Sequence, residues 1–339
     1  MYTTVYCIAS ILLPRDAPTV PAVLHYTSPI RSGLKHGEYV GFAADPVLSD
    51  PALPRLVDSR VARQVHVQNA RTTAEPFTLA RHGFEIRRWP TRVRDFADSA
   101  VVLQHYVPEI EALVSASVRA GGARGIRAVV VWDLCLRSSE LINEFQVTVQ
   151  AADAQVAGST LDRLAPVPLV HADFYSPRDV YRRLRQRLTR PTDTLSTFMR
   201  ADFAAAGLSA SDLERCMAAR VMSVNVWRSI DAHHPVRRCP LALCDPGSLT
   251  KPADELVPFE IHCPDVSFAE AHVLADGADA HEWYHFPEMR QDECLVFVSG
   301  DTAGAWPAAP HSSFDDPRST DADPPRRSIE ARVFVIFDE

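Results

Sequence analysis

The sequence predicts a mainly β fold of the α+β class, a jelly-roll-like barrel with peripheral helices. Short apolar runs separated by Pro, Gly and Asp recur through the second half of the chain, which is typical of barrels built from many short strands. One of these runs carries the pair His171 and Asp173, and a lone histidine, His311, follows late in the chain. Barrels of this kind often enclose a ligand site, so we expect these residues to mark one.

Composition and charge exclude several classes of function. The 339 residues suffice for one large domain or two ordinary ones, and 46% of them are hydrophobic. The net charge of −8 argues against a nucleic-acid-binding protein. Residues 6–13 are apolar, but the run is too short to span a membrane and no basic residue precedes it. The seven scattered cysteines include no Cys-x-x-Cys pair, which indicates reduced thiols in a cytoplasmic protein.

Residues 1–120 are expected to supply strands and one helix that pack on the core. Residues 20–26 are a candidate strand. Between residues 95 and 118 the apolar positions recur at helical spacing, with Asp95 near the start of the helix. Glycines at 121, 122 and 125 break the chain before residues 126–136, a strong candidate for a buried strand.

Residues 121–339 are expected to form the barrel core, with a helical insertion at about 176–220. Ser176 and Pro177 signal a helix start, and helices are predicted at 178–188, 194–206 and 211–219. Short strands are predicted at 221–230, 241–243, 259–261 and 295–298. A last strand, 329–337, is apolar on both faces beyond Arg332, as in the interior of a sheet. With no repeat and no clear linker, we predict a single domain over residues 1–339.

Two histidines and one aspartate form the first candidate site. On a strand, His171 and Asp173 point to the same face. Two imidazoles and one carboxylate on one face of a metal leave open positions opposite, the arrangement of non-haem Fe(II) oxygenases. With His311 as the third ligand, these positions would take a cosubstrate and O2. A His-x-Asp pair can equally be a histidine paired with a carboxylate in the core, and the residues alone leave that alternative open.

Two arginines are candidates to bind the cosubstrate. Arg326 and Ser328 lie at the edge of the last strand, with Arg326 15 positions after His311. A guanidinium can hold the distal carboxylate of 2-oxoglutarate bidentately, and a hydroxyl adds a further donor. Arg332 is a rival because it follows on the same strand. Either arginine could instead pair with a surface carboxylate such as that of Glu330.

A competing motif of the form His-Glu-x-x-His runs from His281 through Glu282 to His285. In zinc proteases two such histidines lie one helical turn apart and bind zinc, and the glutamate acts as a base. Here the aromatic residues in the motif and the following Pro287 favour a strand or loop over the required helix. A zinc hydrolase at these three residues is therefore the weaker alternative.

Four further residues are candidate substrate contacts: Asn225, Arg228, Tyr284 and Phe337. Strand alternation puts Asn225 and Trp227 on one face and Arg228 on the other. Polar side chains within a buried strand suggest ligand contact, although a hydrogen bond in the core explains Asn225 about as well.

Taken together, these stretches resemble the oxygenase family that includes gibberellin desaturase and the CmcJ-type component of cephamycin 7-methoxylation. The resemblance covers most of the chain from about residue 65, and its main matching stretches are 170–173, 225–228, 240–245, 281–289, 310–317 and 326–332. The sequence departs from the family pattern after strand 295–298, before His311 and at Arg327. These departures bear on the substrate more than on the metal.

The resemblance implies a double-stranded β-helix, the cupin-like jelly roll, and an enzyme that uses Fe(II), 2-oxoglutarate and O2. By position, His171, Asp173 and His311 would hold iron, and Arg326 with Ser328 would bind the cosubstrate. The implied substrate is a small molecule of specialised metabolism that bears a carboxylate or an amine. Hydrogen abstraction from it would lead to hydroxylation, desaturation or ring closure, including closure of an amino acid to an aziridine.

One alternative keeps the fold without the chemistry. A non-catalytic barrel subunit that binds a companion enzyme would need neither His171 nor Asp173 for its activity. Besides a small-molecule substrate, the partners that we expect are such a companion enzyme or a second copy of the chain.

Overall fold

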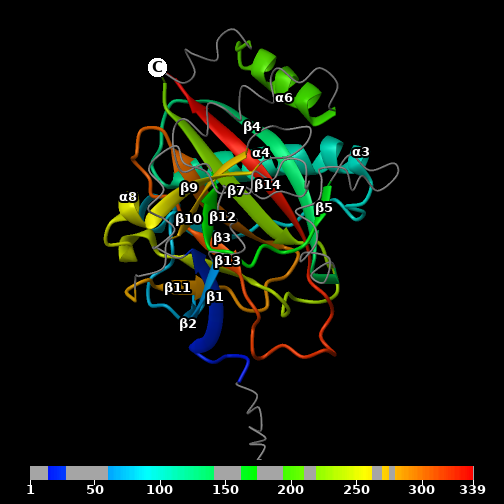
Figure 1. Cartoon of the computed structure of the whole chain (residues 1–339). Coiled ribbons are helices and arrows are strands. Elements are labelled where there is room, and N and C mark those ends of the chain that lie inside the picture. The colour runs from blue at the N-terminus through cyan, green and yellow to red at the C-terminus, as the bar shows by residue number, and fades with distance from the viewer. Residues whose placement is uncertain are drawn as a thin grey trace, which may run out of the picture.

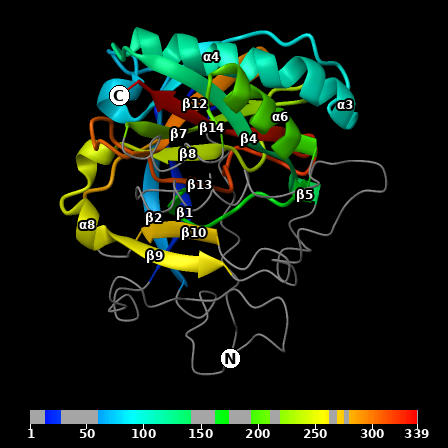
Figure 2. The same cartoon turned by 90° about the horizontal axis from the view of Figure 1, so that it is seen from above.

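Two facing β-sheets form the centre of the protein, and helices cover the outer face of one of them (Figures 1 and 2). The structure is a computed structural model that describes residues 14–27, 60–140, 162–173, 194–209, 219–261, 269–274 and 279–338. Within these ranges strands dominate and helices lie at the periphery. The predicted fold class, a mainly β jelly-roll core with peripheral helices, is therefore confirmed.

The first sheet has eight strands in the order β1-β2-β11-β8-β13-β6-β10-β9. They are β1 (Thr19–Thr27), β2 (Arg60–Asn69), β6 (His171–Asp173), β8 (Leu241–Cys244), β9 (Leu256–Ile261), β10 (Ala269–Leu274), β11 (Trp283–His285) and β13 (His311–Ser313). β13 is antiparallel to both β8 and β6 and lies between them. The strand with the late histidine is thus inserted beside the strand with the His-x-Asp pair.

The second sheet has six strands in the order β3-β12-β7-β14-β4-β5. They are β3 (Phe84–Arg88), β4 (Ile126–Ser138), β5 (Asp162–Leu164), β7 (Val221–Ser229), β12 (Glu293–Asp301) and β14 (Arg327–Phe337). β14 pairs with β4 on one side and with β7 on the other, over nearly its whole length. With the helical layer on one face of this sheet and the eight-stranded sheet on the other, β14 is buried on both faces, which explains why its sequence is apolar on both.

One continuous helix lies across the outer face of the six-stranded sheet (Figure 2). It comprises α3 (Ser99–Val101), a π-helical turn η1 (Val102–Tyr106) and α4 (Val107–Ala120). Its buried face packs on alternate residues of β7, β12 and β14, including Val224, Val226, Val296, Val298, Val333 and Val335. Burial of these aliphatic side chains contributes roughly 1.5–3 kcal/mol each to folding.

The helix begins later than the sequence predicts. Asp98 is the N-cap, and its side chain accepts hydrogen bonds from the backbone N–H groups of Ala100 and Val101. Asp95 instead accepts from the N–H of Ala97 in the preceding turn. Both aspartates can cap a helix, but only Asp98 immediately precedes the residues with helical geometry.

The remaining helices are short or lie at the edges. They are α2 (Leu79–His82), α6 (Thr194–Ala205), α8 (Pro252–Glu255) and the 3-10 turn η4 (Pro246–Ser248). α6 falls within the predicted insertion, and Phe203 from it packs with Trp132 and Phe334 of the six-stranded sheet. The helix predicted at 178–188 lies outside the described residues, and the one at 211–219 lies almost entirely outside them.

Two further observations concern membranes and thiols. In the part of the chain that the structure describes, no helix has the length and apolar character needed to cross a bilayer. The described cysteines are all buried and form no disulfide with one another; they are Cys135, Cys239, Cys244 and Cys294.

Candidate active site

The candidate site lies where the two histidine strands meet. His311 of β13 pairs directly with His171 of β6, and their ring centroids lie 4.4 Å apart. Asp173 follows on the same face of β6. One ligand atom from each of these three residues lies within 4.8 Å of the other two. Among the described residues, they form the one group of three or more potential metal ligands at such distances.

Each imidazole presents its Nε2 atom to this cluster. His171 Nδ1 lies 2.7 Å from the carbonyl oxygen of Leu169, and His311 Nδ1 lies 3.2 Å from that of Ala309. Because a carbonyl only accepts hydrogen bonds, Nδ1 carries a proton in both rings, and Nε2 is the nitrogen left for a metal. Burial, together with the neighbouring His171, lowers the pKa of His311 to about 4 and keeps this ring neutral. A neutral imidazole with a fixed tautomer is the form that ligates a metal.

A buried carboxylate completes the cluster. Burial alone would raise the pKa of Asp173, but Arg332, the two imidazoles and a hydrogen bond from Asn225 hold it well below its usual range. Asp173 Oδ1 lies 3.9 Å from Nε2 of His171. Two imidazole lone pairs and one ionised carboxylate form the donor set that suits non-haem Fe(II). The residues present therefore fit the metal that the sequence motifs imply.

Arg326 lines the same pocket as the two histidines. Its Nε donates to Ser328 Oγ at 3.1 Å, and its Nη1 donates to the carbonyl oxygen of Cys239 at 2.6 Å. The guanidinium lies over the Trp227 ring, 5.2 Å from its centroid. Burial and the nearby Arg137 lower the pKa of Arg326 to about 10, so the group remains cationic at neutral pH. Since Arg326 forms no ion pair with another described residue, it can bind an anion in this pocket.

The rival arginine, Arg332, is fully engaged by carboxylates. Its Nη1 lies 2.7 Å from Asp133, its Nη2 lies 3.2 Å from Glu330 and its Nε lies 3.3 Å from Asp173. Every nitrogen of the guanidinium thus faces an acidic partner. Of the two arginines left open by the sequence, the geometry favours Arg326 for the cosubstrate. Both side chains lie inside the protein and not on its surface.

Sequence reasoning did not assign Arg137 and Glu330 to the site, yet both line the pocket. Arg137 Nε donates to Glu330 Oε2 at 2.9 Å, and its Nη1 donates to the carbonyl oxygen of Ala165 at 2.9 Å. Burial opposes ionisation of Glu330, but Arg332 and Arg137 hold its pKa below the usual range. A signal was present, because each is a charged residue within an apolar strand. The residue pattern alone does not show which of these charges face inward.

The predicted substrate contacts fall on different sides of the sheet. The amide of Asn225 donates a hydrogen bond to Asp173, one of the three potential metal ligands. Arg228 lies on the opposite face of β7, where it donates to a backbone carbonyl at Trp89 and packs against the ring of Tyr106. Phe337 belongs to the same helix-side core. The sheet thus separates Arg228 and Phe337 from the metal-ligand cluster, whereas Asn225 lies beside it.

The His-Glu-x-x-His stretch does not form a helix. Its last three residues are β11, so its histidines do not share a helix face. His281 Nε2 lies 2.9 Å from Glu255 Oε2, and Glu282 accepts a hydrogen bond from Tyr284 Oη at 2.9 Å. The hydroxyl of Tyr284, one of the predicted substrate contacts, thus forms a hydrogen bond with Glu282. The zinc hydrolase alternative lacks the geometry that it requires.

We expect Glu282→Gln to retain full activity, because Glu282 bonds Tyr284 and lies outside the metal-ligand cluster. Succinate formation from 2-oxoglutarate should stay within about twofold of wild type. Surface substitutions of this kind usually change the free energy of unfolding by less than about 0.5 kcal/mol, so the fold should be intact as well. A loss of bound metal or of most activity in Glu282→Gln would instead support the zinc hydrolase alternative.

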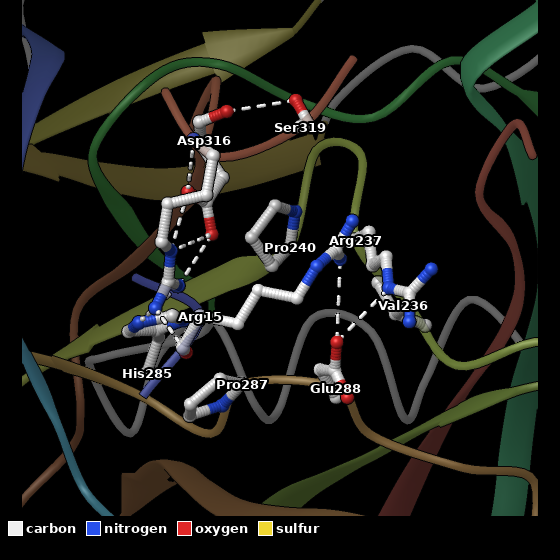
Figure 3. A pocket seen from close by; sticks show the side chains of 10 residues that line it. Arg15, Val236, Arg237, Pro240, His285, Pro287, Glu288, Asp316 and Ser319 are labelled. Carbon is white, nitrogen blue, oxygen red and sulfur yellow. Dashed lines mark hydrogen bonds and ion pairs between the residues drawn. The ribbon is translucent and has the colours of Figure 1, made fainter. Parts of the chain in front are cut away.

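His285 lines a small polar pocket beside Arg15, Arg237 and Glu288 (Figure 3). Arg237 Nε donates to Glu288 Oε1 at 3.0 Å. His285 Nε2 accepts a hydrogen bond from Arg318 Nη2, at 3.1 Å. Burial, and then the charge of Arg318, lower the pKa of His285 to about 4. The neutral ring is therefore the form that the folded protein accommodates.

This depressed pKa predicts a loss of stability in acid. In the unfolded chain the pKa of His285 is about 6.5. Above that pH the ring is neutral in both states, so this histidine takes nothing from the free energy of unfolding. As the pH falls from about 6.5 to about 4, the unfolded state gains the proton first and unfolding becomes easier by about 3 kcal/mol. Chemical denaturation of metal-free wild type and His285→Gln over this range isolates the contribution. Parallel pH dependences in the two proteins would contradict it.

Comparison with known proteins places the chain in a family. A family model described as an oxidoreductase/YMDC permease-like domain matches residues 24–336. The chain belongs to this family. Among its relatives, the alpha-ketoglutarate-dependent dioxygenase phiK of a fungal species is 24% identical over 264 residues, covering 77% of this chain and 80% of that protein. The hydroxylase/desaturase efuI of Hormonema carpetanum is 24% identical over 337 residues, covering 96% and 97%.

Solved structures agree in fold. The iron and alpha-ketoglutarate-dependent endoperoxidase NvfI matches with a TM-score of 0.65 and 18% identity, covering 95% of this chain and 99% of that one. A variant of the same enzyme matches with a TM-score of 0.68 and 19% identity, covering 96% and 100%. The membership predicted from the motifs is confirmed: the chain is an enzyme of the Fe(II)/2-oxoglutarate-dependent oxygenases. The cofactors of that family are Fe(II), 2-oxoglutarate and O2.

Proposed function

We propose that this enzyme holds Fe(II) through Nε2 of His171, Nε2 of His311 and a carboxylate oxygen of Asp173. The observation that carries the proposal is the convergence of these three ligand atoms within 4.8 Å, in a pocket that also contains a buried guanidinium with no ion pair to another described residue. That guanidinium, Arg326, would bind the distal carboxylate of 2-oxoglutarate with help from the Ser328 hydroxyl. A dicarboxylate that ligates the metal at one end needs such a cation at the other.

Bound iron, with 2-oxoglutarate and O2, supplies the power to abstract a hydrogen atom from an unactivated carbon. The residues of the chain position the reactants. Carbonyl acceptors at Leu169 and Ala309 keep a proton on Nδ1 of each imidazole and orient both rings, so that Nε2 is the nitrogen that would hold the metal. Trp227, Phe297 and Leu241 line the pocket with apolar surface, which limits water and strengthens the charge interactions inside it.

For the substrate, we propose a small molecule of specialised metabolism that bears a carboxylate or an amine, and hydroxylation or desaturation as the outcome. The names of efuI and of CTB9 from Cercospora beticola, which is 28% identical over 294 residues and covered to 77% of its length, both read hydroxylase/desaturase. Ring closure, as in conversion of an amino acid to an aziridine, starts from the same abstraction. The position of the substrate carbon selects among these outcomes, since small displacements change rates strongly.

Product analysis tests this proposal. The enzyme is incubated with Fe(II), ascorbate, 2-oxoglutarate and a panel of amino acids, amines and carboxylic acids, and products are followed by mass spectrometry. We expect a product that has gained one oxygen atom or lost two hydrogen atoms, formed together with succinate. Succinate formation that no panel member accelerates, but that a neutral compound does, would overturn the proposed substrate class.

A further inference from the structure

The two oxygens of the Asp173 carboxylate have different surroundings. Oδ2 accepts hydrogen bonds from Asn225 Nδ2 at 2.9 Å and from Arg332 Nε at 3.3 Å. Oδ1 lies on the side of His171 Nε2, at 3.9 Å. One oxygen is therefore bound by two donors of the protein, and the other faces the imidazoles.

We propose that Asn225 and Arg332 are positioning residues that restrict Asp173 to metal ligation through Oδ1 alone. This inference rests on the proposed metal site. Rotating Oδ2 toward the metal would break two hydrogen bonds to an ionised group, and hydrogen bonds to charged groups are stronger than those between neutral groups. Because the site is buried, water does not replace the lost donors.

Asn225 is suited to this role because both N–H groups of its amide donate to buried carboxylates and its oxygen is held by a third partner. Nδ2 donates one hydrogen to Asp173 Oδ2 and the other to Glu330 Oε1 at 3.1 Å. Its Oδ1 accepts from Ser299 Oγ at 2.9 Å, which fixes the orientation of the amide. Both N–H donors of Asn225 are thus used inside the protein. The contact that the structure shows for Asn225 is with the far oxygen of Asp173.

Arg332 adds charge and rigidity at the same oxygen. Asp133 and Glu330 hold its two terminal nitrogens, so its Nε can donate only in the direction of Asp173. A guanidinium anchored by two other carboxylates loses little further freedom when it binds a third. Asp173 is thus pre-oriented before any metal arrives.

Ligation through a single oxygen has a chemical consequence. With two Nε2 atoms and one Oδ1 atom as ligands, the chain would hold the metal from one side and would leave positions for the cosubstrates. Ligation through both Asp173 oxygens would take a position that 2-oxoglutarate and O2 need. Asn225 and Arg332 therefore protect the coordination sites of the cosubstrates without touching them.

Cobalt(II) titration of the metal-free enzyme tests the inference without relying on activity. We expect Asn225→Ala to bind Co(II) about 10–100-fold more weakly than wild type, the usual effect of removing a partner of a metal ligand. Its Co(II) absorption spectrum should also change, because a freed Oδ2 can join the coordination. The matched control is Ser223→Ala. Ser223 lies two residues earlier on the same face of β7, is fully buried, and its hydroxyl has no hydrogen-bond partner among the residues that the structure describes.

The outcomes separate this inference from the proposed metal site. If wild type binds no Co(II), or if Asp173→Ala binds it equally well, the proposed site is wrong. If wild type binds and Asp173→Ala does not, while Asn225→Ala matches Ser223→Ala in affinity and spectrum, the positioning role is overturned. Should Asn225→Ala not fold, Ser299→Ala and Arg332→Lys carry the same comparison, with a weaker but distinct spectral change expected in each.

Discussion

Asp173→Ala is expected to abolish iron binding and, with it, 2-oxoglutarate turnover. The substitution removes the one carboxylate of the cluster and leaves two imidazoles, which hold a divalent cation poorly. Because it removes a ligand itself, the loss of Fe(II) affinity should exceed the roughly 10–100-fold loss typical of removing an outer partner. Equilibrium dialysis against Fe(II) under anaerobic conditions, with metal analysis, measures it.

Asp133→Asn is the matched control for this variant. Asp133 also pairs with Arg332, at 2.7 Å, but lies outside the metal-ligand cluster. The Asp133→Asn substitution removes a carboxylate partner of Arg332 but no metal ligand. Iron binding should therefore change far less than in Asp173→Ala. Equal iron content in wild type and Asp173→Ala would contradict the assignment of this carboxylate. Equal losses in the two variants would attribute the effect to Arg332.

Arg326→Met is expected to weaken 2-oxoglutarate binding with little effect on the metal. The side chain is buried and cationic, and it meets no carboxylate among the described residues. Removing one partner of a buried charge pair costs at least about 2 kcal/mol, which corresponds to a rise of about 30-fold in the KM for 2-oxoglutarate. Arg326→Lys should recover only part of this, because an ammonium cannot reproduce the two-pronged guanidinium contact.

The neighbouring Arg327 supplies the control for this second prediction. Arg327 is exposed and pairs with Glu140 at the surface, at 3.0 Å. Arg327→Met removes the same charge one position along the strand, so its KM should remain near that of wild type. A rise in KM of similar size in both variants would indicate a general electrostatic effect, and an unchanged KM in Arg326→Met would remove Arg326 from the cosubstrate site.

Much of this site could be predicted from local patterns. Apolar runs in the sequence predicted the positions of β4, β7, β12 and β14 to within a few residues. A strand that is covered on both faces needs apolar residues on both faces. The spacing of His171 and Asp173 placed both side chains on one face of a strand. The structure then showed that His311 is their neighbour, which depends on β13 inserting between β8 and β6. β13 itself has three residues, too few for a sequence pattern.

What could not be predicted depends on which face of a strand points inward. β7 is buried on both faces, so alternation separated Asn225 from Arg228 but did not identify the side that carries the site. The role of Arg332 was equally hidden, because its partners Asp133 and Asp173 come from β4 and β6, on two different sheets. Those three side chains come together because β14 pairs with β4 in this register and because the two sheets face each other.

Formation of succinate from 2-oxoglutarate by wild type, with Fe(II) and O2 each present or withheld, tests whether this enzyme is an iron- and 2-oxoglutarate-dependent oxygenase. Many enzymes of this type turn over the cosubstrate slowly without substrate, so no metabolite has to be known. We expect succinate only when iron and oxygen are both present. Succinate that forms without added iron in metal-free protein, or no succinate with any substrate and no iron bound, would contradict this expectation.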